Sequence, residues 1–233
     1  MNVYRIADLN IACSTQTAYA AAFLAAYEIA PDASVSLIVS DVKADDEASY
    51  LPEASQGVRE VAALLRELAR QMPSFDRLML HAATVVCDGV AYAFIAPSGT
   101  GKTTHATLWK TALGERVHIL NGDKLFVHLR DNEITAYGNP WCGKERLGYN
   151  GCAPLGGLVL LTRSERAYAE PLTPAQMLPH LLCATAFPQA QEERERVLAL
   201  LETLTTSCPL YQLYAPLSTD AVKVMLTAIG GTL

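Results

Sequence analysis

The sequence predicts an α/β protein in which a small N-terminal layer, residues 1–72, packs on a larger core, residues 73–233. Short apolar runs of strand length alternate with longer segments of helical spacing. One of the strands, Val90 to Ala96, leads through a glycine-rich loop into a helix-forming segment. The chain of 233 residues is 51% hydrophobic and 18% charged, which suits a packed core and argues against extensive disorder.

The composition also excludes several classes of protein. The formal net charge of -6, with an isoelectric point near 5.4, gives no overall support to binding of nucleic acid or an anionic membrane. The longest apolar stretch, Ala18 to Tyr27, is too short to span a bilayer, and the first ten residues lack a signal-peptide pattern. The six cysteines contain no C-x-x-C pair, which argues against a zinc site or a disulfide framework. We therefore expect a cytoplasmic protein with no nucleic-acid or membrane partner.

The N-terminal layer is expected to hold two strands and two helices, without recognisable catalytic chemistry. Apolar residues at helical spacing from Val58 to Met72, opposite charged residues, predict an amphipathic helix that stops at Pro73. The other expected elements are strands at Val3–Ile11 and Val35–Val39, an alanine-rich helix at Ala18–Ile29, and an acidic surface loop at 41–56.

A β-hairpin leads into the central motif. Leu78 to Cys87 and Val90 to Ala96 are apolar runs joined by Asp88-Gly89, a strong turn signal. The next residues, which open a helix, are Pro97, Ser98, Gly99, Thr100, Gly101, Lys102, Thr103 and Thr104. A strand, a glycine-rich loop, Lys-Thr and a helix in this order form the pattern of the phosphate-binding loop (P-loop). The sequence therefore predicts a site for a nucleoside phosphate.

The residues of this loop suit that chemistry. Gly99 and Gly101 can adopt dihedral angles closed to other residues, so that backbone N–H groups can turn inward around a phosphate. The N-terminus of the following helix adds a positive dipole end at the same place. Lys102 would reach the β- and γ-phosphates, and the Thr103 hydroxyl would ligate Mg²⁺. Ala96 stands where the pattern usually has its first glycine.

An acidic residue follows at a suitable distance. Val117 to Leu120 is a short buried strand, and Asp123 lies just beyond it. Phosphate-loop enzymes place their second Mg²⁺ contact at the end of such a strand. Aspartate also ends strands because it favours turns, so this signal depends on the loop that precedes it.

The rest of the chain alternates strands and helices around one long loop. Residues 138–157 are rich in glycine and contain Trp141, Lys144 and Arg146, and a loop of this length is usually functional. The other expected elements are a hairpin at 125–137 across Asp131-Asn132, strands at 158–161 and 210–214, a helix capped by Thr173 that kinks or restarts at Pro179, and helices at 192–204 and 220–229.

Three segments resemble the group of HPr kinase and phosphoenolpyruvate carboxykinase, in particular its short bacterial HPr-kinase-like members. They are APSGTGKTTHATLW, the Asp123 segment ILNGDKLFV, and GNPWCGKERLGYNGCAPL, and the likeness runs roughly from Leu78 to Leu213. The resemblance implies a mixed-sheet P-loop nucleotide-binding fold and ATP- and Mg²⁺-dependent transfer of a γ-phosphoryl group to a hydroxyl. It also aligns His81 with a histidine that HPr kinases carry on the strand before the loop strand.

One position departs from the family pattern. The family usually has two adjacent carboxylates, one for the metal and one near the reacting hydroxyl, where this chain has Gly122 and Asp123. Two main hypotheses follow: a kinase for a protein, peptide or small-molecule hydroxyl, and a nucleotide-binding regulator or interaction protein with weak or no catalysis. A nucleotide hydrolase that drives movement has least support. Lys144 and Arg146 discriminate between the first two, because a kinase needs cations near the γ-phosphate.

The predicted site has three parts. Lys102, Asp123, His81, Lys144 and Arg146 are the candidate catalytic residues, residues 97–104 bind the nucleotide, and Thr103 with Asp123 binds the metal. A hydrogen-bonded strand histidine and solvent-facing loop charges are the structural alternatives for His81, Lys144 and Arg146. The acceptor, the choice between ATP and GTP, and the oligomeric state stay open.

Overall fold

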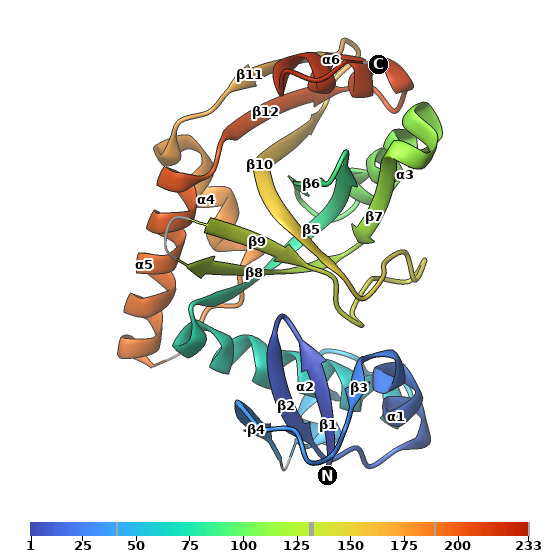
Figure 1. The fold of residues 1–233 in the computed structure, drawn as a ribbon, viewed down its shortest axis with the longest axis vertical. Helices are drawn as coiled ribbons and strands as arrows, with labels where there is room; N and C mark the ends of the chain where they lie inside the picture. Colours follow the sequence, from blue (N-terminus) through green and yellow to red (C-terminus); the bar gives the residue numbers. More distant parts are fainter. Residues whose placement is uncertain (41, 131–132, 189, 233) are drawn as a thin grey trace.

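The computed structural model describes residues 1–40, 42–130, 133–188 and 190–232. It is a mixed α/β structure with two sheets, each of which contains parallel and antiparallel pairs of strands. Figure 1 shows the four-stranded N-terminal sheet with its helices below the eight-stranded sheet of the core. Within the described ranges, no helix is both long and apolar enough to cross a membrane.

The N-terminal sheet has the strand order β3-β1-β2-β4. Its strands are β1 (Asn2–Ile6), β2 (Leu9–Cys13), β3 (Glu28–Ile29) and β4 (Leu37–Val39). The prediction of a single strand from Val3 to Ile11 is wrong, because the chain reverses at Ala7 and Asp8, whose φ angles are 50° and 61°. A left-handed conformation is uncommon for alanine, so this dipeptide gave no clear turn signal.

Two helices pack against this sheet. α1 (Ala18–Leu24) continues as a 3-10 turn, Ala25–Tyr27, and then enters β3, so the helix expected over 18–29 ends early. α2 (Gln56–Gln71) is the expected amphipathic helix and begins after Ser55, whose hydroxyl accepts a hydrogen bond from the N–H of Val58. Buried residues of both helices join those of the strands in one apolar cluster.

The core sheet has the strand order β11-β12-β10-β6-β5-β8-β9, and β7 also pairs with β5. Its strands are β5 (Arg77–Cys87), β6 (Val90–Ile95), β7 (Val117–Asn121), β8 (Lys124–Arg130), β9 (Glu133–Tyr137), β10 (Cys152–Arg163), β11 (Tyr168–Pro171) and β12 (Leu210–Ala215). β9 also pairs with β10, so β5, β8, β9, β10 and β6 form a closed ring of paired strands. β10 is parallel to β6 and β12, and the carboxyl ends of these three strands therefore meet at one edge. β3 and β11 were not predicted.

Helices cover both faces of β10. Leu158 and Leu160 belong to the apolar cluster of α4 (Pro174–Ala184) and α5 (Gln191–Ser207). Val159 and Leu161 belong to the cluster of α3 (Lys102–Leu113) and α6 (Thr219–Ala228). This alternation is that of a strand buried on both sides.

α4 confirms one local prediction and, of the kink or restart expected at Pro179, excludes the restart. Thr173 and Gln176 form the expected capping box at its start. The helix then continues through Pro179 to Ala184 instead of restarting there.

The long loop after β9 is shorter than predicted. It spans 138–151, and β10 runs from Cys152 to Arg163 rather than over 158–161 alone. The glycines of this region suggested a loop, but Gly156 lies inside the strand, where a Cβ atom would come within 2.3 Å of Val90 Cγ1. The small residue is therefore needed for packing between neighbouring strands.

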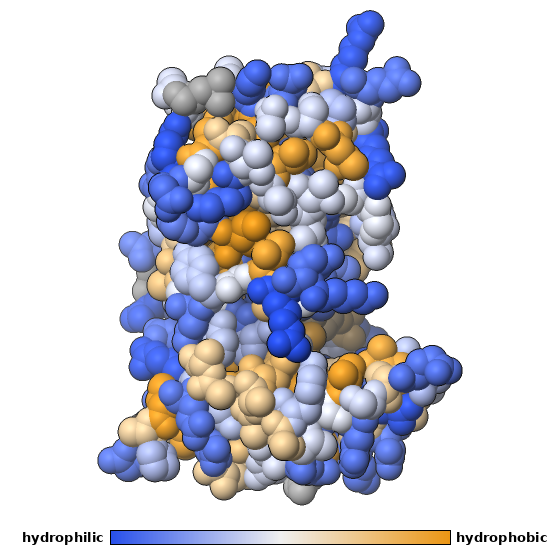
Figure 2. Space-filling model, turned by 90° about the vertical axis from the view of Figure 1, so that its right-hand side faces the viewer, coloured by the Kyte–Doolittle hydropathy of each residue, from blue (hydrophilic) through white to orange (hydrophobic). Residues whose placement is uncertain are grey.

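Side chains of the core complete the apolar cluster of the N-terminal layer. Phe126 and Trp141 are buried in that cluster, and Trp141 Nε1 donates a hydrogen bond to Val61 O of α2 at 2.8 Å. Figure 2 shows that the molecule is narrower just above the N-terminal layer than at that layer. The division between residues 72 and 73 stays a prediction; it falls inside a 3-10 helix, Met72–Phe75.

Candidate functional site

The loop between β6 and α3, residues 96–101, is called the glycine loop here. Gly99 and Gly101 have φ angles of 78° and 105°, which residues with a Cβ atom rarely adopt. Gly101 is the N-cap of α3, so the unpaired N–H groups of the first helical turn face the loop. Pro97, Ser98 and Gly99 are exposed to solvent. The strand, loop and helix thus follow each other as predicted.

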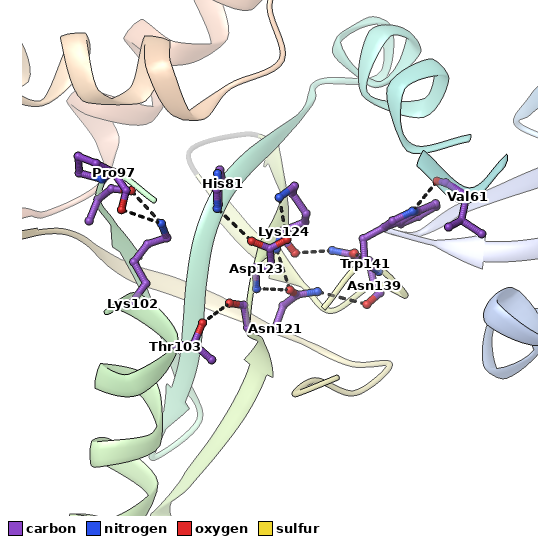
Figure 3. Close-up of polar contacts among 12 residues, drawn as sticks. Val61, His81, Pro97, Lys102, Thr103, Asn121, Asp123, Lys124, Asn139 and Trp141 are labelled. Carbon is purple, nitrogen blue, oxygen red and sulfur yellow. Dashed lines mark hydrogen bonds and ion pairs between the residues drawn. The ribbon is translucent and has the colours of Figure 1, made fainter. Parts of the chain in front are cut away.

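Lys102 is buried beneath this loop. Its Nζ donates hydrogen bonds to Ala96 O at 2.8 Å and to Pro97 O at 3.4 Å (Figure 3). Burial lowers the pKa of Lys102, and the nearby Asp123 carboxylate opposes that shift. An ammonium group has three N–H donors, so Lys102 can accommodate a further acceptor such as a phosphate oxygen.

Thr103 connects the start of α3 to the segment between β7 and β8. Its hydroxyl donates a hydrogen bond to Gly122 O at 3.1 Å. Gly122 directly precedes Asp123. The two residues predicted to bind a metal therefore lie at one edge of the sheet, next to the glycine loop.

The Asp123 carboxylate has two basic neighbours. His81 Nε2 lies 3.0 Å from Asp123 Oδ1, and Lys124 Nζ lies 2.7 Å from Oδ2 (Figure 3). Burial would raise the pKa of Asp123, but the hydrogen bonds from His81 and Lys124 outweigh it and hold the pKa well below its usual range. The side chains of Asp123 and His81 are 33% and 37% exposed, so both are accessible to a ligand.

The described residues contain no group of three or more histidine, cysteine, aspartate or glutamate side chains that could hold a metal ion. This is compatible with Mg²⁺, which usually keeps several waters and takes few ligands from the protein when phosphates are present. The hydroxyl of Thr103 and the ionised carboxylate of Asp123 are oxygen donors of the kind that Mg²⁺ prefers.

Asn121 and Asn139 fix the backbone around Asp123. Asn121 Oδ1 accepts hydrogen bonds from the N–H groups of Asp123 and Lys124, both at 2.9 Å, and its Nδ2 donates to Asn139 O at 3.2 Å. Asn139 Nδ2 in turn donates to Lys124 O at 2.7 Å, and its Oδ1 accepts from the N–H of Trp141 at 3.0 Å. No role was predicted for either residue, although asparagine side chains often bind the backbone two residues further on, as Asn121 does here.

Gly122 is enclosed by the loop of residues 138–151. Its N–H donates to Leu147 O at 2.8 Å, and a Cβ atom would lie 3.0 Å from Cys142 O and 3.2 Å from Leu147 O. The φ angle of Gly122 is not in the left-handed region. A side chain at this position would therefore press on the backbone of the loop, which would have to move by a few tenths of an ångström.

The same loop carries the remaining candidate residues. Trp141 is buried against α2, whereas Lys144 and Arg146 are exposed, and among the described residues neither cation has a hydrogen bond or an ion pair. The loop touches the site at Gly143, where a Cβ atom would lie 3.0 Å from Asp123 Cβ. Lys144 therefore follows directly after the residue that packs on Asp123.

Arg163, at the carboxyl end of β10, was not predicted. Its Nε donates to Thr100 O at 2.9 Å and its Nη2 to Gly99 O at 2.8 Å. A shallow hollow of about 390 Å³ lies between these elements, lined by Pro97, Ser98, Gly99, Thr100, Leu161, Thr162 and Arg163. Nothing in the sequence indicates that β10 is the neighbour of β6, so this contact had no local signal.

His105, in the first turn of α3, is part of the core. It is fully buried, its Nε2 accepts a hydrogen bond from Trp109 Nε1 at 3.1 Å, and burial lowers its pKa to about 4. Thr104, the last residue of the predicted nucleotide-binding segment, is exposed on α3.

Comparisons with known proteins leave the family unassigned. No protein-family model matches the chain, and no curated protein matches it. Among solved structures, the Hpr(Ser) kinase/phosphatase from Coxiella burnetii is similar with a TM-score of 0.38 and 9% sequence identity, over 66% of this chain and 99% of the other. A likeness of this size carries no conclusion about function.

Proposed function

We propose that the chain binds ATP with Mg²⁺ at the glycine loop and transfers the γ-phosphoryl group to a hydroxyl of a protein, peptide or small molecule. The observation that carries this proposal is the hydrogen bond from Thr103 to Gly122 O, next to Asp123. It holds the start of the loop's helix against the backbone carbonyl group that precedes the ionised carboxylate of Asp123. A hydroxyl at the start of that helix and a carboxylate are the pair with which phosphate-loop enzymes hold Mg²⁺.

In this proposal the backbone N–H groups of the glycine loop and the N-terminus of α3 bind the phosphates. Lys102 exchanges its contacts with Ala96 O and Pro97 O for phosphate oxygens. Thr103 and Asp123 hold Mg²⁺, which would neutralise charge on the β- and γ-phosphates. These residues position the groups, and positioning with charge neutralisation supplies most of the catalysis in phosphoryl transfer.

His81 has a role on the acceptor side of this site. It contacts Asp123 Oδ1 and remains partly exposed, so Asp123 can orient the imidazole toward an incoming hydroxyl. A histidine held in this way can take the proton of the attacking hydroxyl. The contribution of such a base is modest in a loose transition state.

A second function is favoured by one specific observation. Gly122 stands where the HPr-kinase pattern that the sequence resembles has a second carboxylate, and loop backbone lies close to it on the side that a side chain would enter. If a single carboxylate is too little for turnover, the chain is a nucleotide-binding regulator whose loop of residues 138–151 responds to the ligand.

Incubation with γ-labelled ATP, Mg²⁺ and a fractionated lysate of the source cell decides between the two functions. The kinase predicts a labelled acceptor with the wild type and none with Asp123→Asn or Lys102→Met. Nucleotide binding without a labelled acceptor in any fraction would favour the regulator.

A further inference from the structure

We propose that a cavity between the N-terminal layer and the two ends of the loop of residues 138–151 binds a small organic cation, such as a primary amine, and that the bound cation holds the ends of this loop together. None of the residues that line the cavity belongs to the glycine loop. The proposed site is therefore separate from the phosphate site and does not depend on the proposed function.

The cavity has a volume of about 240 Å³. From the N-terminal layer it is lined by the turn between β1 and β2 and by residues 26–29, and from the core by residues 137–138 and 150–152. Its volume lies below the range of sites for drug-sized ligands, so the cavity suits a smaller molecule.

The wall formed by the turn between β1 and β2 is fixed to the core. Ala7 and Asp8, which form this turn, both line the cavity. The Nε group of Arg77, a buried residue of β5, donates a hydrogen bond to Ala7 O at 2.6 Å. A wall that is fixed before binding reduces the loss of conformational freedom when a ligand binds.

Tyr27 supplies a buried polar group that no described residue satisfies. Its side chain lines the cavity and is 6% exposed, and its hydroxyl has no hydrogen-bond partner among the described residues. Burial raises the pKa of Tyr27, so the hydroxyl is neutral and can both donate and accept a hydrogen bond. Buried polar groups nearly always have a partner, and a ligand in the cavity would provide one.

The charges of the lining favour a cation. Arg5 and Asp8 form an ion pair with each other. The carboxylate of Glu28 lines the same cavity and has no ion pair or hydrogen bond within the part of the chain that the structure describes. An ammonium group has three N–H donors, which can bind both this carboxylate and the Tyr27 hydroxyl. The rings of Tyr27 and Tyr137 suit an apolar group attached to the amine.

A ligand in this cavity would contact both ends of the loop that packs on Asp123. The N–H of Gly138, at the start of the loop, donates to Gly151 O, at its end, at 2.9 Å. Asn150 Nδ2 donates to Ala26 O of the N-terminal layer at 3.2 Å. The bound cation would add to these two contacts, so we expect the backbone at the ends of the loop to open less often.

Three probes of similar shape and different charge test the class of ligand. Benzylamine is a cation at neutral pH, benzyl alcohol is uncharged and phenylacetate is an anion. NMR titration of the wild type should show that benzylamine binds about 10-fold or more tightly than the other two, since a hydrogen bond to a charged group contributes about 1.5–3 kcal/mol. Glu28→Gln should remove this preference, and Tyr27→Phe should weaken the binding of benzylamine. Glu165→Gln is the matched control, because it removes an exposed carboxylate outside the cavity.

The cysteines locate the probe in the wild type. Cys152 is exposed and lines the cavity, whereas Cys183 is exposed on α4 and lies outside it. Benzylamine should slow the alkylation of Cys152 by iodoacetamide, leave that of Cys183 unchanged, and slow hydrogen exchange at the N–H of Gly138. Equal affinity for the three probes, a preference that survives in Glu28→Gln, or unslowed alkylation of Cys152 would overturn the cation site. Unchanged hydrogen exchange with benzylamine bound would overturn its effect on the loop.

Discussion

Lys102 is a buried cation whose hydrogen-bond partners are two backbone carbonyl groups, with no carboxylate in direct contact among the described residues. Folding therefore disfavours its charge, as the lowered pKa indicates. Such a residue stabilises the free protein little, and a ligand that brings negative charge would gain from it. The combination is typical of a binding residue rather than a structural one.

Lys102→Met tests this interpretation. The substitution should leave the free energy of unfolding unchanged or higher, because it removes a desolvated charge at similar volume. It should weaken ATP binding by roughly 10- to 150-fold, because a hydrogen bond to a charged group contributes about 1.5–3 kcal/mol. Denaturant titration and calorimetry measure the two effects. A large loss of stability with unchanged affinity would make Lys102 structural.

We expect that Gly122→Asp does not add a working second carboxylate to this site. The new Cβ atom would press on Cys142 O and Leu147 O, which are backbone atoms. We expect a loss of about 1–3 kcal/mol in stability and no gain in phosphoryl transfer. Gly122→Ala is the control, since it adds the same Cβ atom without a carboxylate. Faster transfer by Gly122→Asp than by Gly122→Ala would show that the loop moves to accommodate the side chain and that the new carboxylate contributes to phosphoryl transfer.

The carboxylate of Asp123 makes the free energy of unfolding depend on pH. Its pKa is lowered in the folded protein, so its interactions contribute stability above its unfolded pKa of about 3.9, and that contribution is lost as the pH falls through the folded value. The difference in unfolding free energy between wild type and Asp123→Asn should therefore shrink as the pH falls below about 4. A difference that does not change down to the acid limit of the folded state would contradict the His81 and Lys124 contacts.

At the scale of elements, the loop of residues 138–151 is the support of the site. It is held by Asn139, which is 1% exposed, and it covers Gly122 and touches Asp123 through Gly143. In the proposed function this loop lies on the side of the hydroxyl acceptor, so we expect its loosening to affect transfer more than nucleotide binding.

Asn139→Ala measures that support. Loss of its buried hydrogen bonds should cost about 1–3 kcal/mol of stability and lower the rate of transfer while leaving the ATP affinity within about twofold. Asn150→Ala is a suitable control in the same loop, because Asn150 is exposed and donates one hydrogen bond, to Ala26 O. If the two substitutions lowered stability and the transfer rate equally, Asn139 would not support Asp123 through this loop.

The elements also show which features a sequence can predict. The run from β6 through the glycine loop to α3 was readable because its pattern is local: a strand, two glycines with positive φ and a helix start. The turn at Ala7 and Asp8 was misread because alanine rarely adopts a left-handed conformation. The strand position of Gly156 was misread because its packing against Val90 overrides the usual preference of glycine for loops. Arg163 and Asn139 were missed because each acts on a segment brought close only by the fold.

At the scale of the whole molecule, the N-terminal layer and the core share one apolar cluster. Trp141 and Phe126 of the core lie in it, and Trp141 binds α2 through Val61 O. We therefore expect the layer and the core to unfold in one transition. Trp109→Phe leaves Trp141 as the only tryptophan, so its fluorescence reports the junction and far-UV circular dichroism reports the whole chain. A junction that melts at lower denaturant concentration than the rest would contradict this coupling.

The central claim is that the glycine loop, Thr103 and Asp123 form one Mg²⁺–nucleotide site. The most direct test is the calorimetric affinity for ATP, with and without Mg²⁺, of the wild type and of Asp123→Asn. We predict that Mg²⁺ tightens ATP binding by about 10-fold or more in the wild type and has little effect in Asp123→Asn, because the carboxylate holds the metal beside the phosphates. The same dependence on Mg²⁺ in both proteins, or no binding of ATP by the wild type, would contradict the claim.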